Sequence, residues 1–202
     1  MNCERLCMKI YSHRVNSVSA LAEIDPKYGV EIDLRTNNGN LILAHDPFTE
    51  GDLFSDWLKF WRGQSLILNV KEDALENSIL QYLNEHGVSD FFFLDQSYPS
   101  IRRTINSGLK KVATRVSDYE DLQTALNSGS DWVWLDSFSG KWDYLNEAVS
   151  VLAKNGQKTC LVSPELQRAH SSAELKLLQE MILEKRLAIT SVCTKLPEIW
   201  ES

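Results

Sequence analysis

Short runs of apolar and β-branched residues recur along the chain, and amphipathic helical patterns separate them. The runs cover residues 8–12, 30–34, 66–70, 91–94, 111–115, 132–135, 159–162 and 189–193. Strands that alternate with helices at this pace form a parallel sheet, because each crossover returns the chain to the same direction. A closed (β/α)8 barrel needs eight such strands, so the pattern predicts an α/β fold in which residues 1–202 form a single TIM-barrel domain.

Helix starts are marked by a hydroxyl followed three residues later by a glutamate. Ser117–Glu120 and Ser171–Glu174 have this capping-box spacing. In a capping box the hydroxyl and the carboxylate satisfy backbone N–H groups that the first turn leaves unpaired. We therefore expect a helix to begin at each of these two segments.

A ninth strand-like run, Leu41–His45, does not fit the barrel count. It follows the second strand after six residues, 35–40, which are too few for a crossover between parallel strands but suit a hairpin. We therefore predict a β-hairpin extension after the second strand.

The hairpin register decides which residue faces His45, since a slip of one residue turns every side chain to the other face. If 37–39 form a three-residue loop with Gly39 left-handed, Thr36 pairs with Asn40 and Glu31 lies opposite His45. A two-residue Asn38-Gly39 turn would instead set Ile32 opposite His45. We prefer the three-residue loop, because it gathers the polar groups on one face.

Polar residues stand at the ends of the first three strands and after the hairpin. They are His13 and Arg14, Glu31 and Asp33, His45 and Asp46, and Asn69 with Lys71. All would lie at the C-terminal rim, where barrel enzymes place their active sites. Glu31 and Asp33 are two apart on a strand, so both carboxylates point to the same side.

These residue types predict a metal-assisted phosphoryl site. Two carboxylates facing an apolar core are costly to bury unpaired, whereas a hard divalent cation would satisfy both, and oxygen ligands favour Mg²⁺ or Ca²⁺ over zinc. His13 and His45 would flank a phosphorus atom, one taking a proton from the attacking oxygen and the other giving one to the leaving group. Arg14 and Lys71 would hold the phosphoryl oxygens.

Later strand ends carry further candidates. Arg115 ends the fifth strand and would bind a phosphate, with a rim salt bridge as the alternative. After the sixth strand, Asp136 would contact a substrate hydroxyl and Trp134 would stack on a sugar or headgroup, with core packing as the alternative for the indole.

Charge and composition narrow the partners. The formal net charge is −7 and the pI about 5.1, so the protein's field repels polyanions and argues against nucleic acid or an anionic membrane as partner. No apolar run is long enough for a bilayer span, and the start of the chain lacks a secretory apolar stretch, so we expect no membrane insertion and a cytoplasmic location. The four cysteines have no zinc-site spacing, and we expect packing thiols at Cys160 and Cys193.

Several of these segments together resemble one enzyme family. His13-Arg14, Val30–Leu34, Thr36–Gly39 and His45-Asp46 are similar to the His-Arg-Gly, Glu-x-Asp, Thr-x-Asp-Gly and closing His-Asp motifs of the glycerophosphodiester phosphodiesterases. The likeness continues through 68–71, 97–98 and 194–197. It implies a metal-dependent barrel that cleaves a glycerol- or sugar-linked small-molecule phosphodiester, in some relatives through a cyclic phosphate formed by a neighbouring substrate hydroxyl.

The resemblance also assigns roles to individual residues. His13 and His45 would be the acid–base pair, and Glu31 and Asp33 would be metal ligands. Asn69 stands where the family has its third acidic ligand, and an amide oxygen brings no charge, so metal affinity should fall unless Asp95 compensates.

Two other functions stay open at this point. Asn69, and Lys195 in place of the family's terminal aspartate, allow a degenerate barrel that binds a phosphorylated ligand without turnover. Alternatively, Lys71 would serve as a base or Schiff-base amine in a metal-independent lyase or isomerase.

Overall fold

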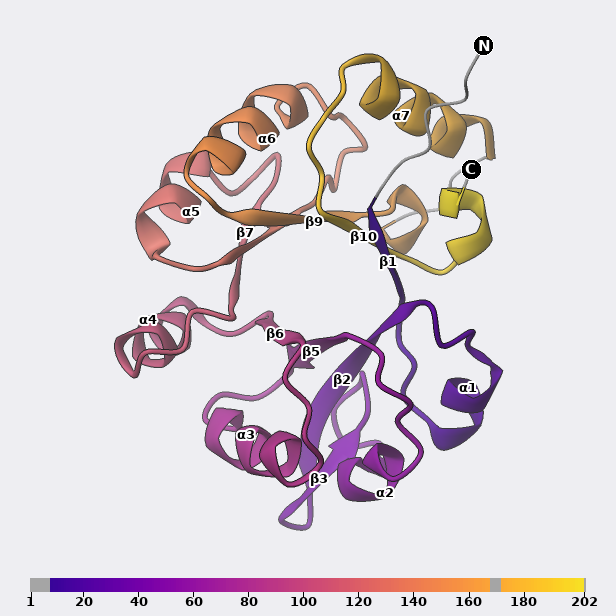
Figure 1. The fold of residues 1–202 in the computed structure, drawn as a ribbon. Helices are drawn as coiled ribbons and strands as arrows, with labels where there is room; N and C mark the ends of the chain where they lie inside the picture. Colours follow the sequence, from indigo (N-terminus) through magenta and orange to yellow (C-terminus); the bar gives the residue numbers. More distant parts are fainter. Residues whose placement is uncertain (1–7, 168–171, 202) are drawn as a thin grey trace. The chain divides into compact units, whose positions relative to one another are not determined.

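The structure of the chain is a computed structural model that describes residues 8–167 and 172–201 (Figure 1). The chain forms two compact units. The first unit is Tyr11–Ala113, and the second unit consists of Thr114–Ser202 with Met1–Ile10. Both units are mixed α/β, as the alternation of patterns predicts.

The first unit is built on parallel strands. The last two residues of β1 (Lys9–Ser12) belong to this unit and pair with β2 (Gly29–Asn37). β2 also pairs with β5 (Leu66–Val70), and β5 pairs with β6 (Phe91–Leu94). The β2–β5 register sets Glu31 beside Ile67 and Asp33 beside Asn69. The carboxyl ends of β2 and β5 therefore lie side by side, which brings the predicted polar residues to one edge.

Helices of the first unit cover the sheet with apolar side chains. They are α1 (Val18–Glu23), α2 (Phe54–Leu58), α3 (Glu76–Glu85) and α4 (Tyr98–Asn106). Phe54 and Trp57 of α2 are fully buried in one cluster with Ile79 of α3 and with strand residues such as Ile32 and Leu68. Figure 1 shows α2 and α3 beside the sheet formed by β2, β3 and β5.

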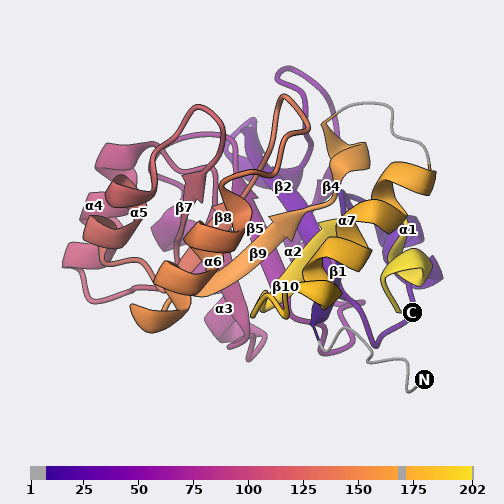
Figure 2. The same ribbon diagram turned by 90° about the horizontal axis from the view of Figure 1, so that it is seen from above.

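The second unit repeats the alternation. Its strands are β7 (Ala113–Val116), β8 (Trp132–Leu135), β9 (Lys158–Val162) and β10 (Ser191–Thr194), and β8, β9 and β10 are parallel neighbours. Its helices are α5 (Leu122–Ser128), α6 (Leu145–Lys154) and α7 (Ser172–Glu184), with 3-10 turns η1 (Pro164–Leu166) and η2 (Pro197–Glu201). In Figure 2 α6 and α7 lie over β8, β9 and β10. Cys160 and Cys193 are buried in β9 and β10, as predicted for packing thiols.

All eight predicted parallel-barrel strands occur with ends within about three residues of their expected positions, and the hairpin also forms. β3 (Asn40–Leu43) returns antiparallel to β2 and is followed by β4 (Asp52–Leu53). Within the described residues the longest helix is α7 with 13 residues, and no helix there is long and apolar enough to cross a bilayer.

The predicted hairpin register is wrong. Asn37 pairs with Asn40 and Leu34 with Leu43, so the turn has two residues, Asn38 at φ 48° and Gly39 at φ 79°. Two successive positive φ angles give a type I′ turn, whose twist matches that of the strands, and Asn-Gly is the sequence best suited to it. The predicted three-residue loop would have set His45 opposite Glu31 in the strand pairing. In the structure β3 ends at Leu43, the Ala44 N–H donates to the carbonyl of Asp33 at 3.0 Å, and His45 follows this last hydrogen bond between the two segments.

One predicted helix start is also displaced. The Glu120 N–H donates to Ser117 Oγ as in a capping box, but the Glu120 carboxylate accepts from the Ser117 hydroxyl and the Ser117 N–H donates to the Glu120 carbonyl. These bonds close a turn, and α5 begins at Leu122 with Asp121 as its N-cap. Local hydrogen bonding of this kind is equally available to a turn and to a helix. The other predicted start, Ser171, lies outside the described residues.

Candidate active site

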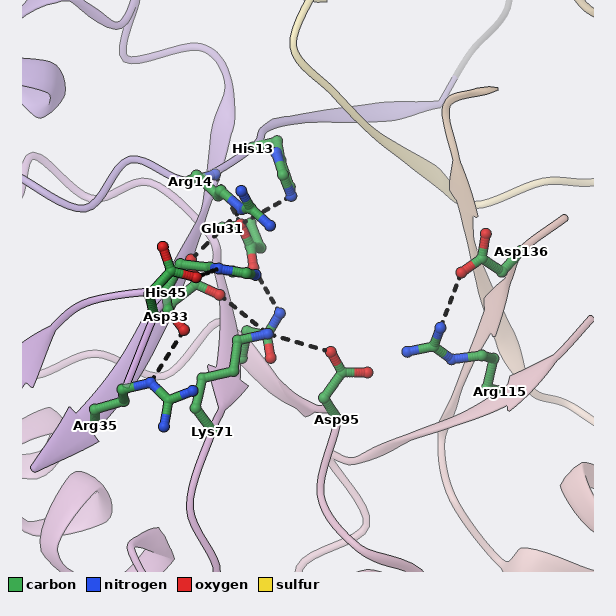
Figure 3. A network of polar contacts seen from close by, with 12 residues as sticks. His13, Arg14, Glu31, Asp33, Arg35, His45, Lys71, Asp95, Arg115 and Asp136 are labelled. Carbon is green, nitrogen blue, oxygen red and sulfur yellow. Dashed lines mark hydrogen bonds and ion pairs between the residues drawn. The ribbon is translucent and has the colours of Figure 1, made fainter. Parts of the chain in front are cut away.

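Glu31 and Asp33 form the buried centre of the site, on β2 (Figure 3). Their exposed fractions are 1% and 0%. Strand alternation directs both carboxylates to the same side, as predicted. The two acids would repel each other there without donors around them, so the identity of those donors decides the chemistry.

Glu31 is held by one backbone and one side-chain donor. The Arg14 N–H donates to Oε2 at 2.7 Å, and Asn69 Nδ2 donates to Oε1 at 2.9 Å. Arg14 takes a left-handed φ of 56°, uncommon for a residue with a Cβ, and strain of this kind is concentrated at functional sites. Burial, followed by the negative charge of Asp33, raises the pKa of Glu31 from 4.5 to about 7 against these hydrogen bonds and the charge of Lys71.

Asp33 is held by Asn16 and by two cationic side chains. Asn16 contacts it twice, because its Nδ2 donates to Oδ2 at 2.7 Å and its Oδ1 accepts the Asp33 backbone N–H at 2.8 Å. Lys71 Nζ lies 3.2 Å from Oδ1, and Arg14 Nε lies 3.9 Å from Oδ2. These contacts offset part of the cost of burying the Asp33 carboxyl group.

Lys71 connects Asp33 to the next strand end. Its backbone N–H donates to the carbonyl of Leu34 at 3.0 Å, which fixes its place at the end of β5. Its ammonium lies 3.5 Å from Asp95 Oδ2, and Asp95 follows β6 with a left-handed φ of 59°. Lys71 therefore sits between two carboxylates, with 16% of its side chain exposed.

The two histidines reach the site from different segments. His13 follows β1, and its Nε2 lies 3.9 Å from Glu31 Oε2 with 12% of the side chain exposed. His45 follows β3, its Nδ1 hydrogen-bonds Asp46 Oδ1 at 2.8 Å, and it is 37% exposed. The hydrogen bond from His45 lowers the pKa of Asp46. Figure 3 shows both histidines in the group of side chains around Glu31 and Asp33.

Eight predicted site residues thus fall in one cluster of the first unit. They are His13, Arg14, Glu31, Asp33, His45, Asn69, Lys71 and Asp95. The other three belong to the second unit, where Arg115 Nη1 pairs with Asp136 Oδ2 at 2.9 Å and Gln167 Nε2 donates to the same oxygen at 2.8 Å. Trp134 is buried there in β8, with 5% of its surface exposed.

Sequence reasoning missed three residues that support the site. Asn16 holds Asp33, and Arg35 Nε donates to the carbonyl oxygen of His45 at 3.0 Å. Glu72 lies 3.8 Å from Arg35 and accepts from the hydroxyl of Thr36 at 2.6 Å. The one available signal was position, since Asn16 follows His13-Arg14 closely and Glu72 follows Lys71.

The arrangement does not fit a divalent cation as it stands. Each of the four oxygens of Glu31 and Asp33 has a nitrogen within 3.2 Å, and Asn69 presents its N–H group rather than its oxygen to Glu31. Among the described residues no group of three or more Asp, Glu, His or Cys side chains is placed to hold a metal ion. The cation predicted on Glu31, Asp33, Asn69 and Asp95 remains a prediction.

The chain has the fold of the glycerophosphodiester phosphodiesterases of known structure. It aligns with such an enzyme from Parabacteroides distasonis at TM-score 0.70 and 15% identity, over 96% of this chain and 95% of the other. Those from Agrobacterium tumefaciens (TM-score 0.70, 13% identity, 96% and 100% covered) and Thermotoga maritima (TM-score 0.69, 13% identity, 97% of both chains) are similarly close. The resemblance inferred from the sequence is therefore confirmed at the level of the fold.

Other comparisons show less similarity. Phosphoribosyl anthranilate isomerase from Thermus thermophilus aligns less well, at TM-score 0.54 and 11% identity over 96% of this chain and 92% of the other. The sequence matches no protein-family model and no curated protein. The similarity thus resides in the backbone, and the chemistry has to be argued from the side chains.

Proposed function

We propose that the protein is a phosphodiesterase, a phosphoric diester hydrolase, acting on a glycerol- or sugar-linked small-molecule phosphodiester through His13 and His45. One observation carries the proposal: two imidazoles from separate segments join a cluster of two buried carboxylates and two cationic side chains at adjacent strand ends. The fold shared with glycerophosphodiester phosphodiesterases supports it.

His45 serves as the general base in this mechanism. Its Nδ1 donates to Asp46, which selects the tautomer with a lone pair on Nε2 and stabilises the imidazolium that forms later. That nitrogen takes the proton from the attacking hydroxyl as the new P–O bond forms. The partly exposed position of His45 suits a group that must meet a substrate or water oxygen.

His13 serves as the general acid. Its Nε2 lies 3.9 Å from Oε2 of the buried Glu31, which can orient the imidazole as a proton donor. As the bond from phosphorus to the leaving oxygen breaks, His13 gives its proton to that oxygen. A neighbouring hydroxyl of the substrate acting as nucleophile leaves a cyclic phosphate, which water opens in a second step with the two histidines in reversed roles.

Arg14 and Lys71 bind the phosphoryl oxygens. Arg14 is 43% exposed on its side chain and Lys71 is 16% exposed, and both already contact Asp33. Planar guanidinium donors suit two phosphoryl oxygens at once, whereas the ammonium acts as a compact charge. Mg²⁺ or Ca²⁺ on Glu31, Asp33, Asn69 and Asp95, as the sequence predicts, would supply Lewis-acid stabilisation of the phosphoryl oxygens only if it displaced the nitrogen donors that contact these carboxylates.

The Schiff-base alternative loses support, because the Lys71 amine is engaged by Asp33 and Asp95 instead of being free to attack a carbonyl. We also propose that the eight parallel-barrel strands close into one (β/α)8 barrel over residues 1–202. The strand count, the alternation with helices and the likeness to the solved structures support closure.

The test is an assay of glycerophosphodiesters and a generic aryl phosphodiester, each with Mg²⁺, with Ca²⁺ and in EDTA. We expect His13→Gln and His45→Gln to lower kcat by about 10²- to 10⁴-fold, the usual contribution of a general acid or base. His86→Gln is the matched control, since His86 bonds its own helix at the carbonyl of Tyr82. Equal loss in all three variants, or no turnover by the unaltered chain, contradicts the proposal. Phosphorus NMR of the product distinguishes a cyclic phosphate from an open one.

A further inference from the structure

Two buried acids with no counter-charge would be costly, so the candidate site needs a source of positive charge. In a metal site, carboxylate oxygens converge on one point, and each leaves a lone pair for the ion. In this site three of the four oxygens of Glu31 and Asp33 accept hydrogen bonds from nitrogen donors, and the fourth, Asp33 Oδ1, makes no hydrogen bond but lies 3.2 Å from Lys71 Nζ. Those donors come from three places in the chain: the segment after β1, the end of β5 and the residue that follows it.

Asn69 is the first of two residues that change the site. It lies beside Asp33 in the β2–β5 register and is 6% exposed. Its Nδ2 donates to Glu31 Oε1 at 2.9 Å, while its own Oδ1 is buried and accepts no hydrogen bond. The reverse orientation would set the amide oxygen, which cannot donate, against Glu31 Oε1, so the N–H group faces Glu31. Asn69 thus donates a hydrogen bond to Glu31, whereas a carboxylate at this position would need a cation shared with Glu31.

Lys71 is the second residue that changes the site. Its ammonium lies 3.2 Å from Asp33 Oδ1, on the oxygen that Asn16 does not occupy. A divalent ion bound to that oxygen must displace the ammonium or share the oxygen with it, and two cations on one oxygen repel. Asp95 holds Lys71 from the other side at 3.5 Å, which opposes displacement.

We propose that Lys71 supplies the counter-charge of Asp33, and that the amide N–H groups of Asn16 and Asn69 position Asp33 and Glu31, in place of a divalent cation. The site is then organised by nitrogen donors alone. As far as it concerns the substrate, this inference rests on the proposed function, in which Lys71 and Arg14 are the cationic groups that contact the phosphoryl group. The neutralisation itself does not depend on whether the chain turns over a substrate.

The experiment measures Ca²⁺ and Mn²⁺ binding to the full chain by calorimetry, without substrate. We expect the unaltered protein to bind neither ion with a Kd below about 1 mM, the weak end of protein calcium sites. Asn69→Asp keeps the side-chain volume and turns the N–H donor into a third carboxylate. It should lower the Kd for both ions by roughly tenfold or more, because affinity rises with the number of charged ligands.

Lys71→Met tests the same inference from the other partner. Removing the ammonium leaves Asp33 Oδ1 open, so this variant should gain a rise in melting temperature on addition of Ca²⁺ that the unaltered protein lacks. Asn77→Asp and Lys59→Met are the controls. Asn77 is exposed at the start of α3, and Lys59 forms an exposed pair with Asp56 at 2.7 Å.

The result separates this inference from the proposed function. Micromolar Ca²⁺ or Mn²⁺ binding by the unaltered protein overturns the inference and leaves the histidine mechanism in place. Absence of any gain in both Asn69→Asp and Lys71→Met also overturns it. If Asn69→Asp folds less well on its own, restoration of its melting temperature by Ca²⁺ but not by equal ionic strength of NaCl counts in favour.

Discussion

Glu31 offers the sharpest prediction, because its protonation couples the candidate site to the stability of the fold. Its pKa is raised from 4.5 to about 7, first by burial and then by the negative charge of Asp33. A raised pKa means that the folded state holds a proton which the unfolded state has released. The contribution of Glu31 to stability is therefore fully present below pH 4.5 and is lost as the pH rises through about 7.

The magnitude follows from the same two values. A pKa difference between 4.5 and about 7 corresponds to about 3 kcal/mol of the free energy of unfolding. Glu31→Gln removes the titration, so the variant should gain about that much relative to the unaltered protein between pH 4.5 and pH 8. Its absolute stability is offset at every pH, since one of the donors from Arg14 and Asn69 then faces an amide N–H group.

The assay is urea unfolding at several pH values from 4.5 to 8.5 in EDTA, with Glu50→Gln, an exposed carboxylate, as control. The difference in unfolding free energy between Glu31→Gln and the unaltered protein should grow with pH, and the control should show no such trend. A difference that does not vary with pH refutes the reasoning. Repetition with Ca²⁺ in place of EDTA adds a second check, since an ion bound at Glu31 would reverse the sign of the trend.

Three further predictions concern residues that support the site. Asn16→Ala removes both hydrogen bonds to the buried Asp33 and should lower the free energy of unfolding by about 2 to 4 kcal/mol in urea, whereas exposed Asn106→Ala should change it little. Arg35→Met should lower kcat about tenfold or more with KM little changed, because it frees the backbone of His45, and Arg35→Lys should recover part of the loss; an equal rise in KM would contradict this role. Gly39→Ala should cost about 1 kcal/mol in thermal unfolding, since φ is 79° with open space around the Cα, while Gly39→Asn, suited to positive φ, should cost less.

Local patterns were sufficient to predict the strands and the hairpin. Apolar runs such as 66–70 and 91–94 are buried on both faces, so their composition alone distinguishes them from the helices between them. Glu31 and Asp33 were placed on one side by the two-residue period of a strand, and the parallel order of β2 and β5 then brought Lys71 beside them. These are properties of neighbouring residues and of strand direction, and the sequence contains them.

The hairpin register and the donors around the two acids were decided by the tertiary structure. The register follows from a turn whose twist must match both strands, and the orientation of His45 follows from Arg35 and Asp46 after β3 has ended. Whether Asn69 turns its oxygen or its N–H group to Glu31 depends on the charge across the strand pair, and the contacts of Asn16 and Lys71 with Asp33 join segments far apart in the chain. Sequence alone determined which chemical groups reach this edge of the sheet; which atoms face each other there depends on distances across strands, which only the folded chain sets.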